Sequence, residues 1–479
     1  MLHRSLKRIR VAAQLATFMS IVALSTAANA AEIKICGEAA LSPGTKFVNE
    51  YVGTTVGLAN GHYTLAYSAQ SPTGLALPIV GVKWNGHGTV SGYPVESKLN
   101  KPNTLTIYTG LMPPQASPGE RINVNFQLRN YSNGQLVASA TLVVYAVSQD
   151  SEWERVWTTA GDTGIESYTK LYPGDFDGDG AEEILGVDAG GWMTLFHFDG
   201  NDWQWGWSNY GDPDAGGDIY SYRNQLTVGD FNGDDKDELL GSSPSSTWLT
   251  TFHFDGDDWH WGWSNYGNNS AGGGITPYRN RLLAGDFDGD GKDEVLGVAN
   301  SLIALFNFDS GNWQLGWSNY GNTAAGGGIY PYRNSLRVGQ FDDDAKDEVI
   351  GLSSWATVFH FDDNDWRWGW STNGAKKFAG WGYPLESTHR FLIGDIDGDP
   401  SDEVLLTDTG ASAKWATTVE FVAGSPTWSW STYGTMPFID DWSLSSLSDH
   451  FFVRAVSGDP KYLFARRSCR DDAAMFAAQ

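Results

Sequence analysis

The stretch DFDGDGKDE (residues 286–294) alternates acidic residues with small or apolar ones over one tight turn. Ca²⁺ takes about six to eight oxygen ligands, and an EF-hand loop supplies them from alternate acidic positions, a main-chain carbonyl and a later acid. Gly291 stands at position 6, where a sharp turn favours a residue without a Cβ. The pattern predicts a calcium loop with the side-chain ligands Asp286, Asp288, Asp290 and Glu294.

The flanks of this loop do not predict an EF-hand, which needs a helix on each side. The segments NRLLAG and VLGVAN are short apolar runs that are typical of strands. The twelfth position, where an EF-hand places its bidentate glutamate, is Gly297. We therefore expect a strand-loop-strand clip in which Glu294, at position 9, completes the coordination shell with two oxygens.

The acidic loop recurs at a step of about 55 residues, which is the signature of a repeat protein. Three further copies keep a complete ligand set: Asp175, Asp177, Asp179 and Glu183; Asp230, Asn232, Asp234 and Glu238; Asp395, Asp397, Asp399 and Glu403. In the second copy Asp235 replaces the glycine, and aspartate tolerates left-handed geometry. In the fifth copy Pro400 fixes φ and requires a different turn.

Two copies depart from the ligand pattern. The fourth, QFDDDAKDE (340–348), has Gln340 in place of the first aspartate and Ala345 in place of the glycine, which predicts weak or no binding. The sixth, within 450–466, aligns Ala455 and Ser457 with the acids and is expected to be empty. The alternative interpretation of every copy is a polar β-turn without an ion.

A second motif repeats in register with the loops. WQWGWSNYG (203–211) returns at 259–267, 313–321 and 366–374, with its tryptophans at alternate positions as on one face of a strand. Each unit contains four short strand patterns, which predicts the blade of a β-propeller. A strand at 152–157 would complete a last blade whose other strands come from 450–478. We therefore predict an all-β fold with six blades, closed by pairing of the chain ends.

The repeated pattern D-x-[DN]-x-D-G-x-x-[DE] between two strands resembles the FG-GAP (VCBS-type) repeats of integrin alpha-subunit propellers and of many secreted bacterial proteins. The resemblance covers roughly residues 151–479 and implies that calcium binds in the hairpin between the first two strands of a blade. It implies a structural role for the ions. This sequence differs in having glutamate at position 9 and tryptophan-rich outer strands.

The residues before the repeat divide into two segments. Residues 1–31 combine a basic start, an apolar run and the small-residue site ANA, which predicts a secretory signal peptide and a secreted or periplasmic location. Residues 32–150 contain alternating segments such as RINVNFQLRN, which predict an immunoglobulin-like β-sandwich. The propeller is assigned to residues 151–479.

The net charge of −26 disfavours nucleic acid and anionic membranes as partners. No apolar run after the signal segment is long enough to cross a bilayer, so membrane insertion is not expected. The two cysteines, Cys36 and Cys469, could pair in an oxidising compartment or remain unrelated. Sequence leaves the oligomeric state open.

The long connections between blades should open on the face opposite the calcium hairpins. They repeat a Tyr-Arg-Asn triplet: Tyr222, Arg223 and Asn224; Tyr278, Arg279 and Asn280; Tyr332, Arg333 and Asn334. Aromatic faces beside amide and guanidinium donors suit sugars, and several equivalent sites give avidity. The competing interpretation is that these residues only tie the connections to the blades.

The sequence favours a secreted calcium-binding propeller that acts as a binding or adhesion module for a glycan or an extracellular protein. No catalytic set is assigned, although the irregular segment 371–390 contains Glu386 and His389, which could serve as acid and base. A secreted polysaccharide-active enzyme with its site there is one alternative. A purely structural envelope or matrix protein is the other.

Overall fold

A computed structural model describes residues 31–35, 39–41, 46–71, 81–84, 96–101, 103–117, 120–146, 153–158, 164–223, 225–243, 247–342, 344–352, 355–372, 389–399, 401–408, 415–422, 424–431, 438–439, 442–443, 450–467 and 472–478. The chain divides into two compact units, one containing Gly44–Gln115 and Arg121–Val144 and the other containing Tyr145–Gln479. No helix in the described part of the chain is long and apolar enough to span a membrane. The predicted signal segment 1–31 lies outside the described residues except for Ala31.

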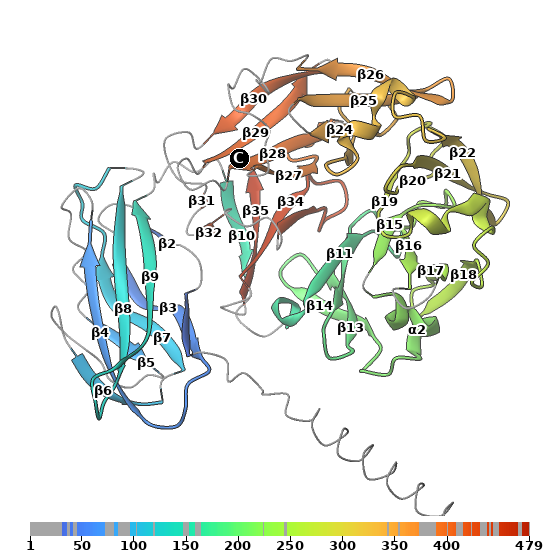
Figure 1. Ribbon diagram of the computed structural model, residues 1–479. Helices are drawn as coiled ribbons and strands as arrows, with labels where there is room; N and C mark the ends of the chain where they lie inside the picture. The colour runs from blue at the N-terminus through green and yellow to red at the C-terminus, as the bar shows by residue number, and fades with distance from the viewer. Residues whose placement is uncertain are drawn as a thin grey trace, which may run out of the picture. The chain divides into compact units, whose positions relative to one another are not determined.

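The N-terminal region consists of antiparallel strands in two sheets (Figure 1). One has the order β1 (Glu32–Ile35), β3 (Lys46–Val56), β7 (Thr104–Leu111), β5 (Gly81–Trp84). The other has the order β2 (Ala39–Leu41), β9 (Leu136–Ala146), β8 (Arg121–Asn130), β4 (His62–Gln70), β6 (Glu96–Asn100). Alternate side chains of β8, from Ile122 to Leu128, are buried, as expected for a sheet with one covered face.

Six four-stranded antiparallel sheets make up most of the described C-terminal unit. Five of them follow the chain directly: β11 (Lys170–Gly174), β12 (Glu183–Val187), β13 (Met193–Phe198), β14 (Trp203–Ser208); β15 (Leu226–Gly229), β16 (Glu238–Ser242), β17 (Leu249–Phe254), β18 (Trp259–Ser264); β19 (Leu282–Gly285), β20 (Glu294–Val298), β21 (Ile303–Asp309), β22 (Asn312–Ser318); β23 (Arg337–Gly339), β24 (Glu348–Leu352), β25 (Ala356–Asp362), β26 (Asp365–Ser371); β27 (His389–Gly394), β28 (Glu403–Asp408), β29 (Trp415–Val422), β30 (Ser425–Ser431).

The sixth sheet joins the two ends of the C-terminal unit. Its order is β10 (Trp153–Thr158), β35 (Asp472–Ala478), β34 (Tyr462–Arg467), β33 (His450–Val453), with Trp153 opposite Ala478. The predicted pairing of the early strand with the end of the chain is therefore present. The first strands also contact one another in the cyclic order β11, β15, β19, β23, β27, β33 and back to β11.

Short helical turns lie in the connections between sheets: η1 (Ile165–Ser167), α2 (Ala215–Asp218), η2 (Ile219–Tyr222), η3 (Gly272–Gly274), η4 (Thr276–Tyr278), η5 (Gly326–Gly328) and η6 (Tyr330–Tyr332). A two-stranded sheet pairs β31 (Phe438–Ile439) with β32 (Trp442–Ser443). The Gly-rich turns lie against the outer strand of the next sheet, where the indole of Trp261 donates to the carbonyl of Gly217 and that of Trp368 to Gly327. Because a Cβ on Gly327 would lie 2.7 Å from the Trp368 ring, these positions require glycine.

The first tryptophan of each WxWGW-type segment is the main packing residue between sheets. Trp203, Trp259, Trp313 and Trp366 are at most 1% exposed. Phe231, from the acidic loop of the preceding sheet, meets Trp313 edge to face with ring centroids 5.2 Å apart. The same contact joins Phe176 to Trp259 and Phe287 to Trp366. Each acidic loop therefore contributes an apolar side chain to the interface with the following sheet.

We expect Trp313→Ala to lower the free energy of unfolding by about 3–5 kcal/mol, because it leaves a cavity between two sheets. Trp205→Ala is the matched control, since Trp205 is 50% exposed and should cost less than about 1 kcal/mol. Urea unfolding followed by tryptophan fluorescence measures both. Equal losses in the two variants would contradict the assignment of the first tryptophan to the interface.

Candidate metal centres

The first aspartate accepts several main-chain N–H groups in the first three loops. In the third loop Asp286 accepts the N–H groups of Gly289 and Asp290 on Oδ1, at 2.7 and 3.1 Å, and that of Gly291 on Oδ2 at 3.0 Å. Asp175 and Asp230 accept the corresponding N–H groups in their own loops. The sixth residue has a positive φ in all three loops, including 63° at Asp235, which confirms the sequence-based expectation that an aspartate adopts this geometry.

The closing glutamate begins the second strand and is buried. Glu294 is 2% exposed, and its Oε2 accepts the N–H of Phe287 at 3.0 Å. The same bond recurs at Glu183, Glu238, Glu348 and Glu403. One of the two glutamate oxygens thus also accepts a main-chain N–H, which leaves it a second lone pair, and coordination of an ion by both oxygens stays a prediction. In the second loop Oε1 of Glu238 accepts the side-chain amide of the predicted ligand Asn232.

The carboxylates of each complete loop converge. Ligand oxygens lie within 4.8 Å of one another in four groups: Asp175, Asp177 and Glu183; Asp230, Asp234 and Glu238; Asp286, Asp288 and Asp290; Asp395, Asp397 and Glu403. Opposite oxygens around one Ca²⁺ at its usual bond lengths lie about 5 Å apart, so each group fits one ion. Buried Oε1 of Glu403 has no hydrogen-bond partner within the described residues, as expected of an atom that faces a cation.

Burial of these carboxyl groups changes their acidity. The pKa of Glu183, Glu238, Glu294 and Glu403 rises from 4.5 to about 8, chiefly because burial disfavours the charged form. Neighbouring aspartates of the same loop raise it further. A cation in the loop would reverse both effects by favouring the ionised form.

A second set of acids, which the sequence analysis did not assign, links each loop to the one before it. Asp237 accepts the N–H of Asp175 on Oδ2 and donates its own N–H to the Asp175 carbonyl, both at 2.7 Å. Asp293, Asp347 and Asp402 repeat this exchange with Asp230, Asp286 and Gln340. Burial raises the pKa of Asp237 to about 7 and that of Asp293 to about 8. The signal in the sequence was the acid that precedes each closing glutamate.

The sixth loop carries cations in place of acids, and the structure corrects its alignment. Val453 lies opposite Tyr462 in the same way as Gly394 lies opposite Glu403, so Arg454, not Ala455, occupies the first loop position. The guanidinium of Arg454 donates to Asp395 Oδ2 at 2.9 Å, where Pro400 has no N–H to offer. Lys461 Nζ lies 3.0 Å from Glu182 Oε1. The predicted absence of an acidic ligand set here therefore has a physical reason, which is internal neutralisation.

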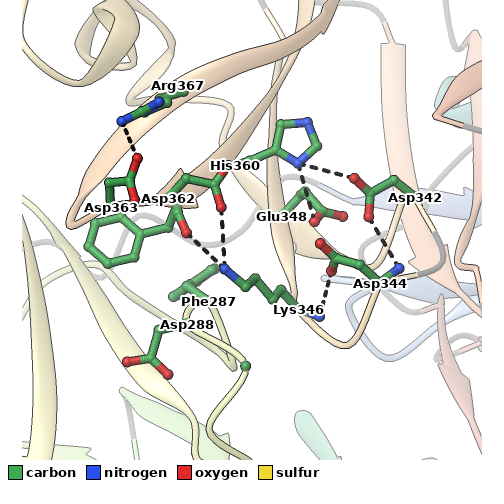
Figure 2. A network of polar contacts seen from close by, with 12 residues as sticks. Phe287, Asp288, Asp342, Asp344, Lys346, Glu348, His360, Asp362, Asp363 and Arg367 are labelled. Atoms are coloured by element: carbon green, nitrogen blue, oxygen red, sulfur yellow. Dashed lines mark hydrogen bonds and ion pairs between the residues drawn. The ribbon is translucent and has the colours of Figure 1, made fainter.

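The fourth loop departs from the others as predicted, but in a specific way (Figure 2). Within the described part of this loop, the Gln340 side chain accepts none of the main-chain N–H groups, and its amide donates to the carbonyl of Asp344. His360, from the third strand β25, places Nδ1 3.4 Å from both Asp342 Oδ2 and Glu348 Oε1. Asp342, Glu348 and His360 thus form a mixed nitrogen and oxygen cluster at the place where the other loops gather oxygens.

On the opposite face, the predicted ligand-binding tyrosines are part of the core. Tyr222, Tyr278 and Tyr332 are 3–6% exposed, and each packs edge to face on a phenylalanine, with centroids 5.2–5.3 Å apart. Their ring faces are not available to a sugar, which favours the structural interpretation of these residues. Of the remaining triplet members, Arg223 and Arg333 stack on Tyr220 and Tyr330, Arg279 is half-buried, Asn280 and Asn334 are exposed, and Asn224 lies outside the described residues.

A different repeated tyrosine reaches the surface on that face. Tyr210, Tyr266 and Tyr320, from the SNYG segments, are 70–80% exposed and have φ between 45° and 50°. Positive φ is rare for a bulky residue and costs free energy, so the surrounding structure must enforce it. Buried Asn209 does so in the first copy by accepting the N–H groups of Met193 and Gly211. Sequence reasoning missed these tyrosines because repetition alone does not separate buried from exposed rings.

Two of the exposed tyrosines have a tryptophan beside them. Trp192 and Tyr210 lie with ring centroids 6.3 Å apart, and Trp248 and Tyr266 with centroids 6.2 Å apart, both edge to face. Asn265 repeats the role of Asn209 in the second pair by accepting the N–H groups of Leu249 and Gly267.

Several residues named in the sequence analysis lie in parts of the chain that the structure does not describe. Residues 373–388, which include Glu386, lie outside the described residues, and His389 begins β27 opposite Asp408. Cys36 and Cys469 also lie outside them.

No family model matches the sequence, and no curated protein matches it. Among solved structures, a lectin of Agrocybe aegerita that recognises non-reducing terminal N-acetylglucosamine is 14% identical over 73% of this chain and 85% of its own, with a TM-score of 0.37. The rhamnogalacturonan lyase YesW is 15% identical over 93% and 90%, with a TM-score of 0.31. A lectin of Aleuria aurantia is 11% identical over 65% and 90%, with a TM-score of 0.31. Scores this low leave the function of this chain to be argued from its own residues.

The raised glutamate pKa values predict how stability depends on pH without metal. A carboxyl whose pKa is higher in the folded than in the unfolded chain contributes stability below its unfolded pKa and loses it as pH rises through the folded value. The melting temperature in chelator should therefore fall between about pH 5 and pH 8. Glu294→Gln should flatten this dependence, whereas Glu154→Gln, an exposed control, should not. A melting temperature that rises with pH in chelator would contradict the argument.

Proposed function

We propose that this protein is an exported, calcium-loaded six-bladed β-propeller of the FG-GAP type that binds glycans through repeated exposed aromatic side chains. The observation that carries the binding proposal is the set of strained, exposed tyrosines on the face opposite the acidic loops. The N-terminal region is proposed to be an immunoglobulin-like sandwich that presents the propeller. Export follows from the signal pattern of residues 1–31.

The six-bladed interpretation is supported by three features of the C-terminal unit. The sheets are four-stranded and antiparallel, their first strands contact one another in cyclic order, and β10 pairs with β35. Through this pairing β35 is covered by β10 and is not left as the edge strand of its sheet.

The calcium proposal is supported by the chemistry of the ligand groups. In four loops the grouped ligand atoms are carboxylate oxygens, and the distances between them suit one Ca²⁺. When bound, the ion would supply positive charge to buried carboxylates. The chain's own residues do the rest: the first aspartate holds the turn, the glutamate fixes the loop to the second strand, and the phenylalanine between them packs on the next sheet.

The glycan proposal is supported by the position and rigidity of the aromatic rings. Topology places Tyr210 after the fourth strand and Trp192 at the start of the third, both at the end of the sheet remote from the acidic hairpin. Aromatic side chains present apolar area with a polar tip and lose little conformational freedom on binding. Repetition of the site from sheet to sheet adds avidity.

Removal of calcium should lower the melting temperature sharply. Each ion contributes about 2.7 kcal/mol at a hundredfold excess over its dissociation constant. Calorimetric titration should find four strong sites, one for each complete loop, and Asp290→Ala should remove one of them. Asp309→Ala, an exposed acid in the β21–β22 turn, is the matched control and should leave the number unchanged.

Replacement of Tyr210, Tyr266 and Tyr320 by alanine should reduce binding on a glycan array by at least about tenfold, because avidity multiplies the loss at single sites. Tyr131→Ala is the control, since Tyr131 is 52% exposed but belongs to the N-terminal unit. Unchanged glycan binding by the triple variant would refute the aromatic sites. Binding only to proteins would refute the glycan proposal while leaving the calcium loops intact.

A further inference from the structure

The fourth loop differs from the calcium loops in ligand chemistry as well as in affinity. His360 lies on β25 one residue after buried Phe359, and its ring extends over the hairpin between β23 and β24. The equivalent residues of the other sheets are His197, His253, Asn307 and Glu420. Within the described residues, neither His197 nor His253 makes an ion pair with the acids of its loop, whereas His360 contacts two.

The distances around His360 match a metal coordination shell. Zn²⁺ binds imidazole nitrogen and carboxylate oxygen at about 2.0–2.2 Å in tetrahedral geometry, so two of its ligand atoms lie about 3.4 Å apart. His360 Nδ1 is 3.4 Å from Asp342 Oδ2 and 3.4 Å from Glu348 Oε1. A small shift of three side chains would therefore admit an ion among these atoms, with water in the remaining position.

The fourth loop differs from the complete calcium loops at its first and sixth positions. Gln340 cannot supply the charge of the first aspartate, and Ala345 replaces the position-6 glycine. Lys346 contacts the end of β25 beyond His360, with Nζ 3.3 Å from Asp362 Oδ1 and 3.5 Å from the Phe361 carbonyl (Figure 2). Gly369 on β26 makes room for the imidazole, because a Cβ there would overlap the His360 ring.

Glu348 is prepared for a ligand role by its second oxygen. Its side chain is 1% exposed, and Oε2 accepts the N–H of Phe341 at 2.6 Å, which fixes the direction of Oε1. Carboxylates that bind a metal are regularly held by a hydrogen bond of this kind to their other oxygen.

We propose that Asp342, Glu348 and His360 form a binding site for a divalent transition-metal ion, with Zn²⁺ as the best fit, separate from the calcium loops of the same unit. Imidazole suits zinc, copper, nickel and iron, whereas Ca²⁺ selects oxygen. Binding requires that His360 release any proton on Nδ1. In this proposal the chain binds two classes of metal ion at equivalent hairpins. The residue on the third strand, His360 in the fourth sheet, decides which class binds.

The test uses the full mature chain with Co²⁺ as a spectroscopic probe. Saturating Ca²⁺ fills the oxygen sites, and alkylation of Cys36 and Cys469 removes the thiols as competing ligands. We expect one Co²⁺ per chain, with the visible absorption of a low-coordinate site, displaced by one equivalent of Zn²⁺. Loss of an outer-shell partner alone commonly weakens a metal site by about 10–100-fold, so loss of a direct ligand should weaken Co²⁺ binding by at least about 100-fold.

His360→Asn is the main variant, because asparagine occupies the same position naturally at Asn307 and should fold. Asp342→Asn provides a second reading at another ligand. His253→Asn is the matched control, a histidine at the equivalent position beside a complete calcium loop. Thermal melting in Ca²⁺ verifies that all variants are folded.

Loss of Co²⁺ binding in His360→Asn and Asp342→Asn, with retention in His253→Asn, supports the proposal. No uptake by the native chain would show that His360 is simply an internal ion-pair partner of the two acids and would overturn it. Equal uptake by His360→Asn, or equal loss in His253→Asn, would also overturn it. The count of one Co²⁺ per chain requires that Ca²⁺ occupy the other loops, whereas the comparison of His360→Asn with His253→Asn does not, and neither depends on glycan binding.

Discussion

A buried glutamate at the start of a second strand is the constraint that the repeated unit has to satisfy. Its Oε2 accepts the N–H of the loop's second residue, and in the first three loops that residue is the phenylalanine that packs on the next sheet. The same hydrogen bond therefore fixes the loop conformation and positions the phenylalanine that packs on the next sheet. The remaining oxygen is buried with several aspartates nearby, and charge confined in this way must be neutralised.

The chain neutralises this charge differently at different hairpins. Four loops gather oxygens that suit Ca²⁺, the fourth loop brings the imidazole of His360 to Asp342 and Glu348, and the sixth replaces acids by Arg454 and Lys461. One of the two bonds between neighbouring loops is nevertheless retained, because the N–H of Lys461 donates to the Asp395 carbonyl as that of Asp237 does to the Asp175 carbonyl. Hairpins with different charged groups thus share part of the same contact with their neighbours.

Sequence predicted the strands, the repeat, the pairing of the chain ends and the positions of the acidic loops, because periodic hydrophobicity and ligand spacing are local properties. It placed Ala455 instead of Arg454 at the first position of the sixth loop. Strand register fixes this position, and register is known only from the folded hairpin. It selected Tyr222 rather than Tyr210, because burial depends on packing between segments. It did not predict that Glu294 Oε2 accepts the N–H of Phe287, because this bond exists only in the folded hairpin.

The cations of the sixth hairpin give the ring an asymmetry. Arg454 and Lys461 bind Asp395 and Glu182, which belong to the two neighbouring hairpins, so this hairpin is neutralised from within the chain. The sheet that contains it is also the one in which the beginning and the end of the C-terminal unit pair. The sheet that pairs the chain ends is thus neutralised by side chains of the protein, which cannot dissociate as a bound ion can. If the acidic loops bind calcium as proposed, a calcium-poor medium would loosen the middle sheets first, while the pairing of β10 with β35 remained.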